Sequence, residues 1–201
     1  MDTMCGWCYG FTEVINKTYE AFKSEFDFNL VPGGLWIGVE VKTVDESLAR
    51  SIRSYNENIS ELTGARFGEA FDKNILQNNG FILDSMPGAK AIVTFNILKK
   101  DYALLYLKKI QEAFFFNGLN TNDWNLYADL AVGFGLSKNL FKEKYDSKET
   151  MKLTVENFTF SQKLGVSGFP SIVVKKNNDT FFVSQGIVSF ENLQNNLAEF
   201  I

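Results

Sequence analysis

Two cysteines, Cys5 and Cys8, lie three positions apart at the start of an amphipathic segment. From residue 11 onward, apolar residues recur at intervals of three and four, which is typical of one face of a helix. These residues are Phe11, Val14, Ile15, Tyr19, Phe22 and Phe26. The sequence therefore predicts that the cysteine pair opens a helix, whose first turn would bring the two side chains together.

The rest of the chain shows three further kinds of pattern. Residues 26–31 alternate apolar and polar before a Pro-Gly-Gly loop, which predicts a strand. Residues 45–165 carry mainly helical periodicity. Residues 171–174 and 181–183 are short β-branched and aromatic runs that predict a hairpin, and Ser189 is placed to cap a last helix. The predicted order is α-β, a helical block, then β-β-α.

Composition excludes several classes of protein. Of the 201 residues, 45% are hydrophobic. This share is enough to form the core of one or two domains, and it argues against a disordered chain. A net charge of −4 argues against a nucleic-acid partner. No apolar run reaches the ~20 residues that span a bilayer, so no membrane partner is expected. The sequence leaves the oligomeric state open.

The chain contains no histidine. Catalytic sites built on a histidine base, and zinc sites that need histidine ligands, are therefore excluded. A structural zinc site usually takes four Cys or His ligands, and one chain offers two, so only a cluster shared across a dimer would remain. We expect no metal and no organic cofactor.

The position of Cys5 indicates reactivity. At a helix start, the free backbone N–H groups and the helix dipole favour thiolate, so we expect its pKa to fall below the free value of ~8.5. Gly6 and Trp7 add no positive charge, so the fall should be mild. Cys5 is then the candidate nucleophile, and Cys8 the thiol that resolves a mixed disulfide. The alternatives are a structural disulfide or two buried thiols.

Pro170 is a second notable residue. It follows Phe169 and enters the predicted strand at 171–174, where proline usually marks an edge or a bulge. On the residues alone an ordinary trans bond is favoured, because only ~5–6% of X–Pro bonds are cis.

The segments 4–11 (MCGWCYGF) and 166–170 (VSGFP), with a helical block between them, resemble the thioredoxin superfamily and, within it, the DsbA-like disulfide oxidoreductases of the FrnE type. The resemblance implies an α/β thioredoxin-like fold with a large helical insertion. It places the thioredoxin-like domain at residues 1–44 and 166–201 and the inserted domain at residues 45–165.

The resemblance also implies a cis Phe169–Pro170 bond beside Cys5, with the Phe169 backbone pairing with a substrate peptide. Trp7 would either contact substrate or pack on the inserted helices. The chain departs from the family in one respect. In the family a central strand of the sheet precedes the cysteines, whereas only four residues precede Cys5 in this chain. We expect this strand to be missing or truncated, and the natural protein to begin further upstream.

The predicted function is that of a thiol–disulfide oxidoreductase or isomerase that exchanges disulfides with protein or small-thiol substrates, glutathione included, in the cytoplasm. A glutathione transferase or isomerase of the kappa type is an alternative, although those relatives have serine at the position of Cys5. A non-redox peptide binder with a cleft of Trp7, Tyr9 and Phe169 is another. The carboxylates Asp2 and Glu13 are both candidates to assist proton transfer to Cys8.

Overall fold

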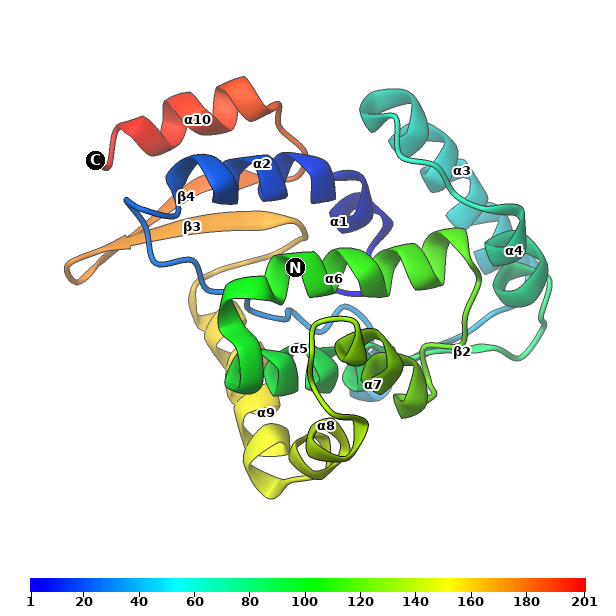
Figure 1. Ribbon diagram of the computed structural model, residues 1–201. Coiled ribbons are helices and arrows are strands. Elements are labelled where there is room, and N and C mark those ends of the chain that lie inside the picture. Colours follow the sequence, from blue (N-terminus) through cyan, green and yellow to red (C-terminus); the bar gives the residue numbers. More distant parts are fainter.

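The computed structural model describes residues 1–201 and is mostly helical (Figure 1). Its α-helices are α1 (Gly6–Gly10), α2 (Thr12–Phe22), α3 (Glu46–Thr63), α4 (Glu69–Phe71), α5 (Ser85–Lys99), α6 (Ala103–Gln111), α7 (Trp124–Val132), α8 (Lys138–Tyr145), α9 (Lys148–Lys163) and α10 (Phe190–Ala198). Short 3-10 helices cover Gly38–Glu40 and Lys100–Tyr102, and π-helical turns cover Asp72–Leu76 and Glu112–Phe116. None of the helices combines the length and the apolar character needed to cross a bilayer.

The strands form two antiparallel pairs. β3 (Ser171–Lys176) pairs with β4 (Asp179–Gln185), which confirms the predicted hairpin. β1 (Lys42–Thr43) pairs with β2 (Ile82–Leu83), a small sheet that the sequence did not predict. The helices α2 and α10 lie beside the β3–β4 hairpin (Figure 1). Buried apolar side chains of these elements form one core. This core contains Phe11, Ile15, Phe22, Val174, Val183, Leu193 and Leu197.

The predicted strand at residues 26–31 is wrong. No strand is present there, and the segment's main-chain bonds to the N-terminus are few. The amino group of Met1 donates to the Val31 carbonyl (3.2 Å), and the Gly33 N–H donates to the Met1 carbonyl (2.8 Å). A strand needs a neighbouring strand for its main-chain hydrogen bonds. Residues 1–4 form no strand in the structure either, in line with the expectation that the central strand is missing or truncated.

The middle of the chain packs around two further cores. α5, α6, α7 and α8 enclose one of them, in which the rings of Phe95 and Tyr106 stack with centroids 3.9 Å apart. The other lies between α3, α4 and the segment 112–116, and it includes Met4 from the segment before the cysteines. The helical block is therefore confirmed as mostly helix. The boundaries of the two predicted domains, at 44/45 and 165/166, stay a prediction.

Candidate functional site

Cys5 and Cys8 are brought together at the start of α1, as their spacing predicts. Cys5 is the N-cap residue, with φ −86° and ψ 112°, and its Sγ accepts a hydrogen bond from the Cys8 N–H at 3.3 Å. Both are free thiols. Cys5 is 5% exposed and Cys8 is completely buried. Cys5, the more exposed residue of the two, is thus the candidate nucleophile, and the fully buried Cys8 is the candidate resolving residue.

Phe169 and Pro170 lie directly beside Cys5. The Cys5 thiol donates to the Phe169 carbonyl at 3.7 Å, a contact between residues 164 positions apart. The Phe169–Pro170 peptide bond is cis, as the resemblance implies, and Pro170 is buried. Gly33 faces the Phe169 ring so closely that a Cβ at this position would overlap the ring. The loop after residue 31 therefore forms one wall of the site.

Trp7 and Tyr9 occupy different surroundings. Trp7 is partly exposed and belongs to none of the three buried cores. The Tyr9 ring stacks on Phe115, with centroids 5.1 Å apart, and its hydroxyl donates to the Arg66 carbonyl at 3.0 Å. The Tyr9 ring thus packs against Phe115, and its hydroxyl bonds the segment between α3 and α4.

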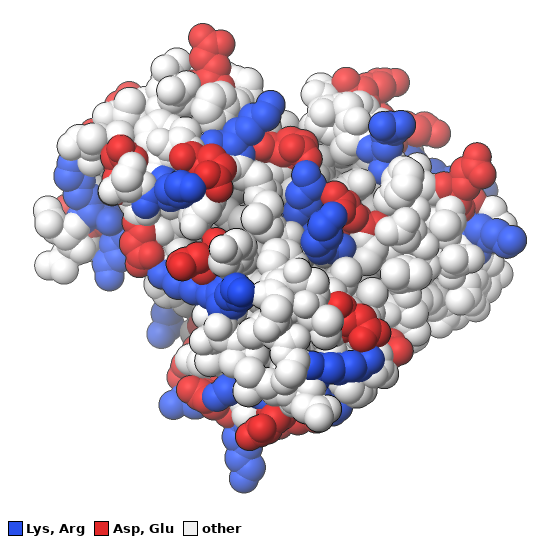
Figure 2. Space-filling model, in the orientation of Figure 1, with Lys and Arg blue, Asp and Glu red and all other residues white.

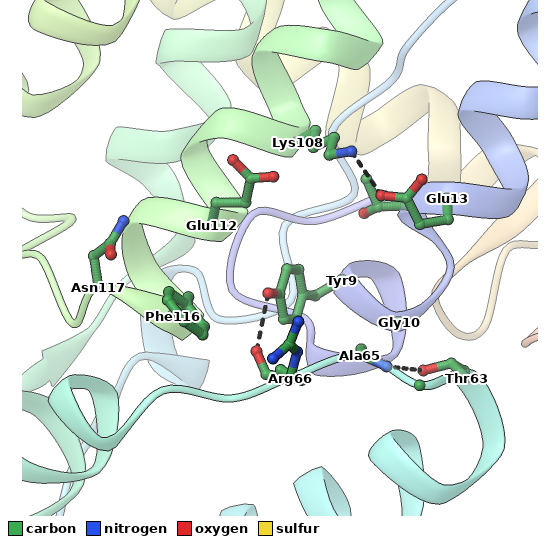
Figure 3. Close-up of a pocket in the computed structure, with 12 residues that line it drawn as sticks. Tyr9, Gly10, Glu13, Thr63, Ala65, Arg66, Lys108, Glu112, Phe116 and Asn117 are labelled. Carbon is green, nitrogen blue, oxygen red and sulfur yellow. Dashed lines mark hydrogen bonds and ion pairs between the residues drawn. The ribbon is translucent and has the colours of Figure 1, made fainter.

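Tyr9 borders a cavity of about 460 Å³, which lies between α1, the start of α2, α6 and the segment that follows α3 (Figure 3). In Figure 2 the surface is hollowed between the part formed by α2 and α10 and the part formed by α3. Glu13 pairs with Lys108 across the cavity wall at 2.6 Å. Neither cysteine and neither Phe169 nor Pro170 lines this cavity. Glu13 is therefore engaged in an ion pair at the protein surface.

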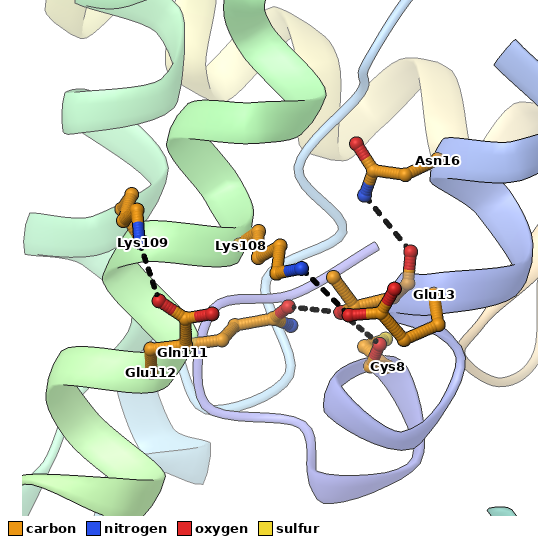
Figure 4. A network of polar contacts seen from close by, with 8 residues as sticks. Cys8, Glu13, Asn16, Lys108, Lys109, Gln111 and Glu112 are labelled. Atoms are coloured by element: carbon orange, nitrogen blue, oxygen red, sulfur yellow. Dashed lines mark hydrogen bonds and ion pairs between the residues drawn. The ribbon is translucent and has the colours of Figure 1, made fainter. Parts of the chain in front are cut away.

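A buried polar network, which the sequence analysis missed, links the dithiol helix to α6 (Figure 4). The Thr12 hydroxyl lies 3.1 Å from the Cys8 carbonyl and 2.7 Å from Gln111 Oε1. Gln111 Nε2 donates to the Asp2 carbonyl at 3.3 Å. Gln111 is completely buried. The one signal in the sequence was that the polar Gln111 directly follows the apolar Ile110. The sequence could not identify the hydrogen-bond partners of Gln111.

The predicted lowering of the Cys5 pKa is wrong. The neighbouring Cys8 thiol and burial raise the pKa of the Cys5 thiol well above its ordinary value, and the negative charge of Asp2 adds to this. The hydrogen bond from the Cys8 N–H acts in the opposite direction. α1 has only five residues, so its dipole is short and does not outweigh these effects.

Comparison with known proteins agrees with this geometry. The thioredoxin family model matches residues 1–194. The chain belongs to the thioredoxin family. No curated protein matches this thioredoxin-family chain in sequence. Its fold is the thioredoxin-like fold with a helical insertion that is found in DsbA-like structures.

Solved structures match over almost the whole length of this thioredoxin-family chain. A candidate protein disulfide isomerase from Nitrosomonas europaea has 25% sequence identity and a TM-score of 0.90, with 99% of this chain and 93% of that chain covered. The cytosolic disulfide reductase DsbM from Pseudomonas aeruginosa has 21% identity and a TM-score of 0.79, with 99% and 93% covered. The structure of DsbM with glutathione has 21% identity and a TM-score of 0.77, with 99% and 94% covered.

Proposed function

We propose that this protein is a thiol–disulfide oxidoreductase that exchanges disulfides through Cys5 and Cys8. The observation that carries the proposal is the position of the Cys5 Sγ, which contacts both the Cys8 N–H and the Phe169 carbonyl. Cys5 therefore lies where an extended peptide could pair with the Phe169 backbone and present its disulfide to the sulfur.

The first step is attack by Cys5 on a substrate disulfide. Cys5 loses its proton, and its thiolate forms a bond to one substrate sulfur while the substrate S–S bond breaks. The leaving sulfur departs as a thiolate and takes up a proton from solvent. The Cys8 N–H donates to the Cys5 Sγ and thereby stabilises the thiolate before the attack.

The second step resolves the mixed disulfide. Cys8 loses its proton and attacks the Cys5 Sγ, which releases the second substrate thiol and leaves a Cys5–Cys8 disulfide. Two electrons have then passed from the dithiol to the substrate. Two small thiols return the protein to the dithiol form and are themselves oxidised to a disulfide. We propose glutathione for this role, and the DsbM structure with glutathione supports the choice.

Several finer proposals accompany this function. The substrates are protein or peptide thiols and disulfides. The protein acts in the cytoplasm, and the description of DsbM as cytosolic supports this location. Residues 1–44 and 166–201 carry the chemistry, whereas residues 45–165 form the inserted helical domain. The contacts of Tyr9 with Phe115 and with the Arg66 carbonyl argue against the peptide-binding cleft. A cysteine at position 5, rather than serine, argues against the kappa-type glutathione transferases.

Trapping tests the proposal. In a Cys8→Ser variant, a disulfide peptide should form a covalent adduct on Cys5 that persists, because the resolving thiol is absent. The Cys5→Ser variant is the matched control and should form no adduct. Intact-mass spectrometry measures both. Absence of insulin reduction and of dithiol-peptide oxidation by the protein with both cysteines would contradict the proposal, and so would an equal adduct in the control.

A further inference from the structure

The dithiol helix α1 is too short to hold its own position. It has five residues, and a helix of fewer than about 12 residues is marginal in water without packing partners. One partner is α3, which lies so close that a Cβ at Gly10 would come within 2.6 Å of the Ile59 side chain. A second contact comes from α6, whose Gln111 side chain bonds residues on both sides of the helix.

Gln111 is the last residue of α6 and is completely buried. Its Nε2 donates to the main-chain carbonyl of Asp2 at 3.3 Å, and its Oε1 accepts a hydrogen bond from the Thr12 hydroxyl at 2.7 Å. A main-chain carbonyl only accepts hydrogen bonds, so the amide N–H must face Asp2 and the amide oxygen must face Thr12. An apolar side chain at position 111 would leave both partners without these bonds in a buried place.

The two partners of Gln111 are each in contact with one cysteine. The Asp2 carbonyl also accepts the Cys5 N–H, at 3.4 Å. The Thr12 hydroxyl lies 3.1 Å from the Cys8 carbonyl (Figure 4). A single side chain of α6 is therefore connected, through one further group on each side, to the main chain of both cysteines.

The resolving step depends most on this arrangement. In that step the Cys8 Sγ forms a bond to the Cys5 Sγ, and the bond between Cys5 and the substrate sulfur breaks. Both of the sulfurs that join belong to the protein, so the main chain around α1 sets their relative position. In the first attack only one of the two sulfurs belongs to the protein, and the other belongs to the substrate. Loss of the Gln111 bonds should therefore slow the second step more than the first.

We propose that Gln111 is a positioning residue for the resolving step: it couples α6 to the main chain of Cys5 and Cys8 and thereby aligns the Cys8 sulfur for its attack. The inference rests on the proposed function, because the resolving step belongs to that function. Gln111 then gives the inserted helical domain, residues 45–165, a part in the chemistry that residues 1–44 and 166–201 carry.

The test uses a small aromatic disulfide, dithiobis(nitrobenzoic acid), because each of the two steps then releases one coloured thiolate. Attack by Cys5 releases the first thiolate, at a rate proportional to the concentration of the reagent. Attack by Cys8 on the resulting mixed disulfide releases the second, at a rate independent of that concentration. Stopped-flow absorbance therefore measures the two steps separately.

Gln111→Met removes both hydrogen bonds and keeps a side chain of similar length. We expect the second step to slow by about tenfold to 100-fold and the first by less than about twofold, since a misplacement of ~1 Å can lower a rate by roughly 100-fold. Thr154→Val is the matched control. It removes a buried hydrogen bond in α9, from the Thr154 hydroxyl to the Thr150 carbonyl at 2.7 Å, and should leave both steps unchanged.

Three results would overturn the proposal: an unchanged second step in folded Gln111→Met, an equal slowing of both steps in that variant, and an equal slowing of the second step in Thr154→Val. If Gln111→Met does not fold, Thr12→Val and Thr12→Ser replace it. Thr12→Val should slow the second step, and Thr12→Ser, which keeps the hydroxyl, should not. Equal rates in this pair would also overturn the proposal. Wild-type protein that shows both steps but reduces no insulin would contradict the proposed function alone.

Discussion

At the scale of single residues, Gly33 determines where Phe169 can lie. Because a Cβ at Gly33 would overlap the Phe169 ring, Gly33→Ala must displace the ring or the loop. We predict a fall in kcat/KM for disulfide reduction of about tenfold to 100-fold, because a misplacement of ~1 Å can lower a rate by roughly 100-fold. Gly168→Ala is the matched control, since a Cβ there meets open space. Insulin reduction measures both, and equal activity of the two variants would contradict the prediction.

The raised pKa of Cys5 gives a second prediction at this scale. Cys5 is mostly protonated near neutral pH, and the reactive thiolate fraction grows as pH rises toward the pKa. The alkylation rate of Cys5 in the wild-type protein should therefore increase about tenfold per pH unit between about pH 6 and about pH 8. Cys8→Ser removes the first cause of the raised pKa, so its rate should level off at a lower pH. A plateau below about pH 8 in the wild-type protein would contradict the prediction.

At the scale of elements, α10 depends on its cap. The Ser189 hydroxyl accepts the Asn192 N–H at 3.1 Å and satisfies one of the free donors at the helix start. Ser189→Ala should lower the free energy of unfolding by about 1 kcal/mol. Urea unfolding measures this loss, and Ser189→Asp, which can accept the same bond, should recover it. An unchanged midpoint in Ser189→Ala would contradict this role.

At the scale of the whole molecule, three buried tyrosines limit stability in alkali. The hydroxyls of Tyr106, Tyr127 and Tyr145 donate to the main-chain carbonyls of Tyr127, Thr121 and Pro87. Burial is the main cause that raises the pKa of each phenol above its ordinary value. The folded protein therefore keeps protons that the unfolded chain loses above about pH 10, the ordinary value for tyrosine. Stability must fall as pH rises beyond that point.

Urea unfolding from about pH 8 to about pH 11 should show this fall, and Tyr127→Phe should reduce its slope. Absorbance at the tyrosinate band provides an independent measurement. Of the seven tyrosines, three should ionise only when the protein unfolds. Ionisation of all seven in protein that is still folded would contradict the prediction.

Local features of this protein follow from the amino-acid sequence. The helix after Cys5, the hairpin of β3 and β4 and the cap of α10 depend on residues close together in the chain, so periodicity and capping preferences predict them. Residues 26–31 show the limit of such patterns. They alternate as a strand does, but a strand also needs a partner, and no local pattern supplies one.

Only the tertiary structure decided how the site is built. The contact of Cys5 with Phe169 joins residues 164 positions apart, and the hydrogen bonds of Asp2 and Gln111 cross between separate segments. The shift of the Cys5 pKa is opposite in direction to its prediction for the same reason. The helix dipole is a local effect, whereas burial and neighbouring charge depend on what the fold places around the sulfur.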